Sequence, residues 1–170
     1  TRALIADPDL PTKARNQQPE QIRVCMGSNE GCIDRLYFGL PIGCVQNPVV
    51  GREQSWGNLT PATKPRHIVV IGGGPAGMET ARVAASRQHQ VTLLERDNKL
   101  GGAIQIVARA SGWESYLQCV TWLKNQLQDL EIDIRLETDA TTNLICSLSP
   151  DAVVVATGAE PRRPNLAGAN

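Results

Sequence analysis

A chain of 170 residues has room for one ordinary domain or two small units, and 41% hydrophobic residues is typical of a globular protein with a buried core. Because 17 basic residues balance 17 acidic ones, no net field attracts nucleic acid or an anionic membrane surface. The short apolar stretches exclude a membrane-spanning helix, and no signal peptide pattern is present. We therefore expect a cytoplasmic protein with neither nucleic acid nor membrane as a partner.

The five cysteines are unevenly distributed along the chain. Cys25, Cys32 and Cys44 lie close together, whereas Cys119 and Cys146 stand alone in periodic segments. An odd number with this spacing suits a metal site better than a disulfide framework. Cys119 adjoins an apolar helical stripe and needs no chemical role.

Residues 1–52 are rich in proline, glycine and cysteine and show little periodicity, apart from short helices expected near 13–18 and 31–38. Something other than a large apolar core must therefore organise this segment. Residues 53–66 are polar and contain two prolines, which is typical of an extended linker between domains.

From His67 onward, short apolar runs alternate with longer helical ones, which indicates an α/β domain over residues 67–170 with a parallel sheet. The expected elements are a strand at 67–72, a helix at 75–88, a strand at 90–95, an amphipathic helix at 112–130, a half-buried strand at 132–136 and a strand at 151–156. The unbroken apolar run in the last strand suits a central position in the sheet. Trp113 and Trp122 of the long helix fit core packing better than a partner surface.

A glycine-rich turn joins the first predicted strand to the first predicted helix. It carries the G-x-G-x-x-G pattern in the strand–turn–helix context that a dinucleotide-binding fold requires. Gly72 allows the tight turn, Gly74 lets the backbone approach a pyrophosphate, and Gly77 lets the helix pack closely on the strand. With Pro75 and Ala76 opening the helix, free N–H groups and a partial positive charge favour phosphate binding there.

An acidic residue, Glu95, follows Gly77 by 18 residues, at the end of the second predicted strand. A carboxylate at that place accepts hydrogen bonds from ribose hydroxyls. The strand, the helix and the acid together favour cofactor binding over an incidental glycine turn. Arg96 has two interpretations, contact with an adenosine phosphate or a solvated basic residue, and it does not predict NADP.

Two further segments, residues 94–102 with a glycine pair and residues 151–159 with an Ala-Thr-Gly turn, resemble flavoprotein pyridine-nucleotide reductases. The resemblance implies that Gly102, Thr157 and Gly158 lie along the bound dinucleotide. At the N-terminus, Thr-Arg-Ala-Leu-Ile-Ala-Asp-Pro, Ile-Arg-Val-Cys and Gly-Leu-Pro-Ile-Gly-Cys-Val-Gln-Asn-Pro resemble the trimethylamine dehydrogenase, histamine dehydrogenase and 2,4-dienoyl-CoA reductase family. This second resemblance covers nearly the whole chain.

Members of that family join an FMN-containing TIM barrel to an iron–sulfur segment and then to a domain that holds FAD or ADP. The resemblance implies that this chain is a fragment of a longer polypeptide, which starts at the end of the barrel and continues into the iron–sulfur segment over residues 1–52. Arg2 matches a family arginine at the last phosphate-binding turn of the barrel, although it is equally well explained as an ordinary surface residue.

The family holds its cluster with the pattern C-x2-C-x3-C-x11-C. This chain matches it at Cys25, Cys32 and Cys44 but has Ser28 at the second position. Because a serine oxygen is a harder ligand than a thiolate, Ser28 ligates iron weakly or not at all. Three outcomes stay open: a four-iron cluster (4Fe-4S), a three-iron cluster (3Fe-4S), or none. Zinc fits poorly, since the two histidines, His67 and His89, lie outside the segment.

The first hypothesis is therefore the electron-transfer portion of an iron–sulfur flavoprotein oxidoreductase, relaying electrons between a barrel FMN, the cluster and an FAD or ADP domain. FAD would imply an NAD(P)H-dependent reductase, and ADP an amine dehydrogenase that passes electrons to a carrier protein. The implied partners are the rest of the polypeptide, this carrier and further copies of the chain, and catalytic residues would lie on the barrel. The alternative is a non-catalytic nucleotide-binding module with a degraded cluster site.

Overall fold

A parallel β-sheet organises the chain from His67 onward. The computed structural model describes residues 1–160, so 161–170 of the predicted domain lie outside the described residues. The strands β1 (His67–Ile71), β2 (Gln90–Leu94), β3 (Ile132–Arg135) and β4 (Ala152–Val155) pair in parallel in the order β3-β2-β1-β4. This is the strand order of doubly wound dinucleotide-binding folds. The predicted α/β class with a parallel sheet is confirmed.

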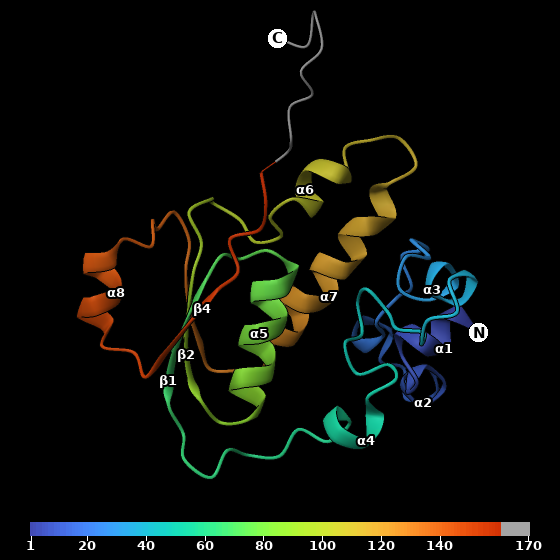
Figure 1. Ribbon diagram of the computed structural model, residues 1–170, viewed down its shortest axis with the longest axis horizontal. Coiled ribbons are helices and arrows are strands. Elements are labelled where there is room, and N and C mark those ends of the chain that lie inside the picture. The colour runs from blue at the N-terminus through green and yellow to red at the C-terminus, as the bar shows by residue number, and fades with distance from the viewer. Residues whose placement is uncertain (161–170) are drawn as a thin grey trace, which may run out of the picture.

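Two helices, α5 (Pro75–Ser86) and α7 (Leu117–Gln128), pack against each other, and α5 also packs on strands β1 and β2 (Figure 1). Small side chains on α5, such as the fully buried Ala81, let this helix lie close to the strands. The core lies between the helices and one face of the sheet and includes Val70, Met78, Ala81, Ala84, Val91, Leu93, Leu100, Cys119, Trp122, Leu123 and Leu127.

The predicted helix over 112–130 is shorter in the structure, where a 3-10 turn at Glu114–Tyr116 precedes α7. Trp122 is only 7% exposed, so core packing is confirmed for it. Trp113 is 45% exposed and stacks on Tyr116, so core packing is wrong for Trp113. Gly112, with φ +84°, precedes it, and glycine readily adopts this backbone conformation. The helix therefore begins later than its apolar periodicity suggested.

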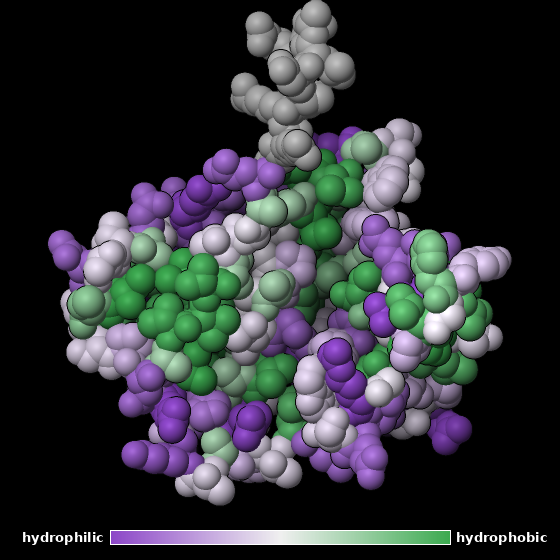
Figure 2. Space-filling view, viewed as in Figure 1, coloured by the Kyte–Doolittle hydropathy of each residue, from purple (hydrophilic) through white to green (hydrophobic). Residues whose placement is uncertain are grey.

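Over residues 1–160, strand β4 lies at one edge of the sheet, and the central position expected for 151–156 stays a prediction for the longer polypeptide. Val153 and Val155 are 41% and 70% exposed, because they point to the face of the sheet opposite to α5 and α7. Figure 2 shows an apolar surface over β4 and α8 (Thr142–Leu148). An apolar run indicates that both faces favour burial, but it does not identify the neighbouring strands.

Several short elements were not predicted. They are α1 (Arg2–Ala6), the 3-10 helix η1 (Pro19–Gln21), α4 (Glu53–Trp56), α6 (Ile104–Val107) and α8. The helix expected near 13–18 is α2 (Leu10–Arg15), which ends before Gln17 at φ 57°, and the one expected near 31–38 is α3 (Ile33–Tyr37). Over residues 1–160, no helix is both long and apolar enough to cross a membrane.

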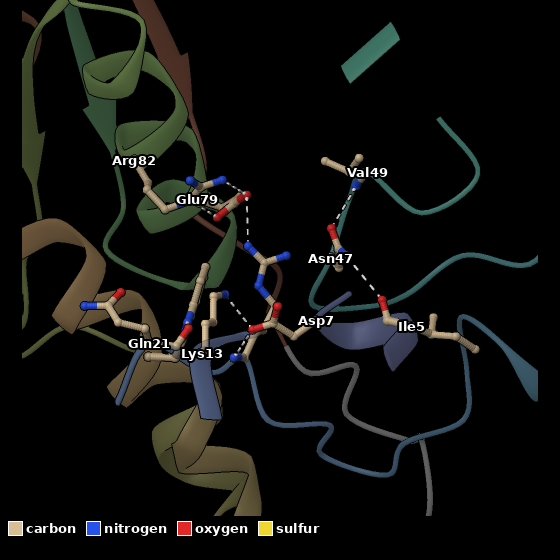
Figure 3. A network of polar contacts seen from close by, with 10 residues as sticks. Ile5, Asp7, Lys13, Gln21, Asn47, Val49, Glu79 and Arg82 are labelled. Atoms are coloured by element: carbon tan, nitrogen blue, oxygen red, sulfur yellow. Dashed lines mark hydrogen bonds and ion pairs between the residues drawn. The ribbon is translucent and has the colours of Figure 1, made fainter. Parts of the chain in front are cut away.

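The N-terminal segment is held together by buried polar groups rather than by a large apolar core. The Asp7 carboxylate accepts hydrogen bonds from Lys13 Nζ at 2.7 Å and from the Arg23 backbone N–H at 2.8 Å. Asn47 donates to the Ile5 carbonyl at 3.2 Å. Figure 3 shows these groups on neighbouring short helices and loops, with Glu79 of α5 close to them. These contacts hold the segment in place where a large apolar core is missing. The buried side chains of Asp7 and Asn47 both have hydrogen-bond partners, as buried polar groups in folded proteins generally do.

We expect Asp7→Asn to destabilise this segment at neutral pH. Burial raises the pKa of the Asp7 carboxyl, but hydrogen bonds from Lys13 and the Arg23 N–H outweigh this and lower the pKa below 3.8. Asp7 therefore stabilises the fold above its unfolded pKa of about 3.9, and this contribution is lost as pH falls through the folded pKa. Denaturant unfolding should show a loss of about 1–3 kcal/mol at pH 7. An equal loss at pH 2 would contradict the ionic explanation.

Candidate functional site

A large cavity of about 740 Å³ opens at the carboxyl ends of β1, β2 and β4. Ligands of open parallel sheets bind at this edge, because the loops that follow the strands converge there. The predicted residues on its wall are Gly72, Gly74, Pro75, Ala76, Glu95, Arg96, Gly102, Thr157 and Gly158. Gly77 is the one predicted nucleotide-site residue that does not line the cavity.

Gly77 instead lies in the contact between α5 and the turn. A Cβ atom at position 77 would collide with the Gly72 carbonyl oxygen, so helix and turn could not meet with any larger residue there. A Cβ at Gly72 would likewise collide with the Ala156 carbonyl, and Gly72 has φ +106°. Glycine at these two positions thus brings α5, the end of β1 and the end of β4 together.

The second glycine pair lies against the first glycine-rich turn. Gly101 donates its N–H to the Gly73 carbonyl at 2.8 Å. A Cβ at Gly102 would lie 3.1 Å from Gly74 Cα, whereas a Cβ at Gly74 meets no protein atom within 4 Å. Gly74 therefore faces open cavity at the N-terminus of α5, where free N–H groups and the helix dipole attract an anion.

The Glu95 carboxylate is buried at the end of β2 and has defined partners. Its Oε2 accepts the Gly73 N–H at 2.6 Å, and its Oε1 accepts the Asp97 N–H at 2.9 Å. A carboxylate has about four acceptor positions, so two stay available toward the cavity. These bonds fix Glu95 beside the glycine turn, whereas the neighbouring Arg96 is exposed at the cavity wall.

The cavity includes residues that sequence reasoning missed. They include Lys99, Gln105, Ile106, Arg109, Thr138, Asp139 and Ala140. A signal for three of them was present, because Thr138, Asp139 and Ala140 follow a predicted strand, and the carboxyl ends of parallel strands share one edge. The short helix α6 had no comparable signal, since it spans only Ile104–Val107.

A second, smaller cavity brings together the cysteine segment. Its wall includes Cys25, Ser28, Cys32 and Cys44, together with Arg2, so the predicted cluster residues share one cavity. Gly31 permits this arrangement, because a Cβ there would lie 2.9 Å from the Val45 backbone nitrogen, beside Cys44. The Gly43 N–H also donates to the Gly31 carbonyl at 2.6 Å, which ties the two loops together.

The donor set of this cavity consists of three cysteine thiols and one serine hydroxyl. Among the described residues, no three histidine, cysteine, aspartate or glutamate side chains are grouped closely enough to hold one metal ion. Iron–sulfur clusters of this kind are held by four thiolates. The cavity wall offers three cysteine thiols, with the Ser28 oxygen at the fourth place of the pattern.

Arg2 lies at the cysteine cavity, where its Nη1 donates to Asn29 Oδ1 at 2.8 Å. Asn29 adjoins Ser28 and has φ 64°, which asparagine tolerates better than most residues. Arg2 therefore connects the beginning of the chain to the cysteine loop. Its predicted contact with an FMN phosphate stays a prediction.

The two remaining cysteines differ in exposure, and we expect them to differ in alkylation. Cys119 is buried in the core, and burial raises the pKa of its thiol to about 11, whereas Cys146 is exposed. Since the thiolate is the nucleophile, Cys119 should be protonated and unreactive at pH 8. Mass spectrometry after iodoacetamide treatment should find Cys146 modified and Cys119 unmodified until the protein unfolds. Equal labelling of both in the folded protein would contradict this expectation.

The parallel sheet, the glycine turn at the N-terminus of α5 and the acid at the end of β2 define a dinucleotide-binding α/β domain. The chain belongs to the pyridine nucleotide-disulphide oxidoreductase family, whose model matches residues 49–143. It is 43% identical to a metal reductase of Desulforamulus reducens, over 97% of this chain and 25% of the relative. It is 44% identical to an N,N-dimethylglycine/sarcosine dehydrogenase of Chromohalobacter salexigens, over 95% of this chain and 24% of the relative.

The fold is also similar to a solved histamine dehydrogenase from Rhizobium sp. 4-9, with a TM-score of 0.91 and 28% identity. That match covers 100% of this chain and 27% of the other. The predicted resemblance to the trimethylamine dehydrogenase, histamine dehydrogenase and 2,4-dienoyl-CoA reductase family is thereby confirmed. The chain spans about a quarter of the length of these relatives. Its family is one of flavoprotein oxidoreductases, which assigns it a redox role.

Proposed function

We propose that this chain is the electron-transfer portion of a longer iron–sulfur flavoprotein oxidoreductase. The cavity beside α5 holds FAD or ADP, with the pyrophosphate at Gly74 and the ribose at Glu95. Cys25, Cys32 and Cys44 hold the iron–sulfur cluster, which supplies one-electron transfer when bound. The observation that carries the proposal is the placement of all three cysteines on one cavity wall, in a segment packed on the dinucleotide-binding domain.

The remaining parts of the proposal lie outside the residues of this chain. A barrel with FMN supplies the catalytic residues in this proposal. Arg2, which lines the cysteine cavity, is the residue proposed to face that barrel. Electrons pass between FMN, cluster and the dinucleotide domain in an NAD(P)H-dependent reductase, or onward to a carrier protein in an amine dehydrogenase. We place this protein in the cytoplasm, where reduced thiols and a cluster are compatible.

One observation favours a second candidate, a non-catalytic nucleotide-binding module with a degraded cluster site. Ser28 occupies the second ligand position of the cysteine cavity, and a serine oxygen binds iron less readily than a thiolate. In that candidate, nucleotide binding is retained and the cysteine segment is held by its hydrogen bonds alone.

The test is anaerobic purification of the full-length polypeptide and of this chain, followed by determination of iron, acid-labile sulfide and released nucleotide. We expect near-stoichiometric iron and sulfide together with FAD or ADP. Electron spin resonance before and after reduction separates a three-iron from a four-iron centre. Folded protein that binds nucleotide with neither iron nor sulfide would refute electron transfer and leave the binding module.

A further inference from the structure

Arg23 is a buried arginine at the contact between the cysteine segment and the dinucleotide-binding domain. It lies two residues before Cys25 and is only 8% exposed. Its guanidinium stacks on the Trp122 ring of α7, with Cζ 4.0 Å from the ring centroid. Its Nη2 lies 4.0 Å from Glu79 Oε1 of α5. One positive charge from the N-terminal segment therefore contacts both helices that pack against the sheet.

The same contact is fixed by hydrogen bonds on either side of Arg23. Trp122 Nε1 donates to the Gln21 carbonyl at 2.9 Å, and Gln126 Nε2 donates to Gln21 Oε1 at 2.6 Å. Met26 packs against the core that contains Trp122. The position of the guanidinium is thus determined by residues before and after it, from both segments.

The charge of Arg23 is incompletely neutralised. Its Nε atom is buried and has no hydrogen-bond partner. Glu79 is also engaged by Arg82, through two hydrogen bonds of 2.8 Å, so one carboxylate serves two arginines (Figure 3). Burying a charge without its full set of partners is costly. Strongly perturbed charges of this kind are enriched at functional sites.

The candidate functional site next to Arg23 along the chain is the cysteine cavity. Cys25 follows Arg23 by two residues and lines the cavity of the proposed cluster. Met26 lines the same cavity and packs against the core that contains Trp122, on which the guanidinium stacks. Asp7 already accepts hydrogen bonds from Lys13 and the Arg23 backbone N–H, so it neutralises the guanidinium only in part.

We infer that Arg23 tunes the cluster proposed at Cys25, Cys32 and Cys44, by holding a fixed positive charge beside it that raises its reduction potential. The inference rests on the proposed function. Reduction adds one electron to the cluster and no proton, so the site gains one negative charge, which a nearby positive charge stabilises. A reduced flavin supplies this electron in the proposed protein, and dithionite supplies it in the test.

The test measures the potential of the cluster in the full-length polypeptide, by dithionite titration with redox mediators followed by spin resonance. Arg23→Gln should lower the equilibrium constant for reduction by roughly tenfold, which is about 59 mV for one electron. Glu79→Gln should shift the potential in the opposite direction, because it removes the carboxylate that opposes Arg23. Arg23→Lys should stay close to the unaltered protein. The matched control is Arg52→Gln, since Arg52 also stacks on a tryptophan, Trp56, but at the exposed surface.

Opposite shifts in Arg23→Gln and Glu79→Gln would support the inference, since loss of packing alone does not produce opposite signs. If Arg23→Gln fails to assemble a cluster, the other two variants still test the inference. A higher reduction potential in Glu79→Gln, together with an unchanged reduction potential in Arg23→Lys, would support it equally. Two results would overturn the inference and leave the proposed function standing. The first is a reduction potential that stays unchanged or falls in Glu79→Gln. The second is a reduction potential that stays unchanged in Arg23→Gln. Absence of iron from the unaltered protein would overturn the proposed function, and this inference with it.

Discussion

Gly74→Ala should weaken nucleotide binding while the fold stays intact, and Gly77→Ala should weaken the fold itself. A Cβ at Gly74 meets no protein atom within 4 Å and points into open cavity, where it would occupy the place of a pyrophosphate. The backbone there is ordinary, with φ −72° and ψ 177°, so alanine causes no strain. A Cβ at Gly77 would instead collide with the Gly72 carbonyl and push α5 away from the turn.

Two measurements separate these effects, namely denaturant unfolding and calorimetric titration with ADP. Gly77→Ala should lose about 1–3 kcal/mol of unfolding free energy, as overpacked sites commonly do. Gly74→Ala should keep its stability and bind ADP at least roughly tenfold more weakly, a loss of about 1.4 kcal/mol. Gly43→Ala is the control, because its Cβ makes only an ordinary contact of 3.6 Å with the Gly31 carbonyl. Unimpaired ADP binding by Gly74→Ala would contradict a pyrophosphate at that turn.

The β1–α5–β2 unit was predictable because all of its signals are local. The apolar strand, the glycine turn and the helix follow one another directly, and Gly72 and Gly77 each have a steric reason in the structure. The pairing of β4 with β1 was not predictable in the same way. A strand's neighbours depend on pairings between distant segments, and Val153 and Val155 would suit a buried strand equally well.

The candidate sites also divide into residues with a local sequence signal and residues without one. The cysteine spacing predicted which residues would gather, and the structure places Cys25, Cys32 and Cys44 on one wall. Arg23 had no signal, because its burial depends on Trp122 and Glu79, which follow it far along the chain. Residues that act through a contact between distant segments are identified only once those segments are placed together in space.

Ser28→Cys should increase the iron and sulfide content of the purified protein and slow the loss of its cluster in air. Ser28 lies on the cavity wall with the three cysteines, so a thiol at this position adds a ligand to an existing set. A soft thiolate binds iron more readily than a serine oxygen, which is a harder ligand. A three-iron spin signal in the unaltered protein should give way to that of a four-iron centre in the variant. Cys44→Ser should have the opposite effect and leave little iron, because it removes one of the three thiolates.

The matched control is Ser55→Cys, which adds a thiol on the exposed helix α4 away from the cavity. It should leave iron content and spin signal unchanged. Equal gains in Ser28→Cys and Ser55→Cys would mean that iron binds thiols nonspecifically, which contradicts a built cluster site. The unaltered protein could already contain a four-iron centre, with the same iron content and spin signal as Ser28→Cys. That result would mean that the fourth iron is held by Ser28 or another oxygen. Either result is decisive, because the cavity has only this one position where the cysteine pattern is broken.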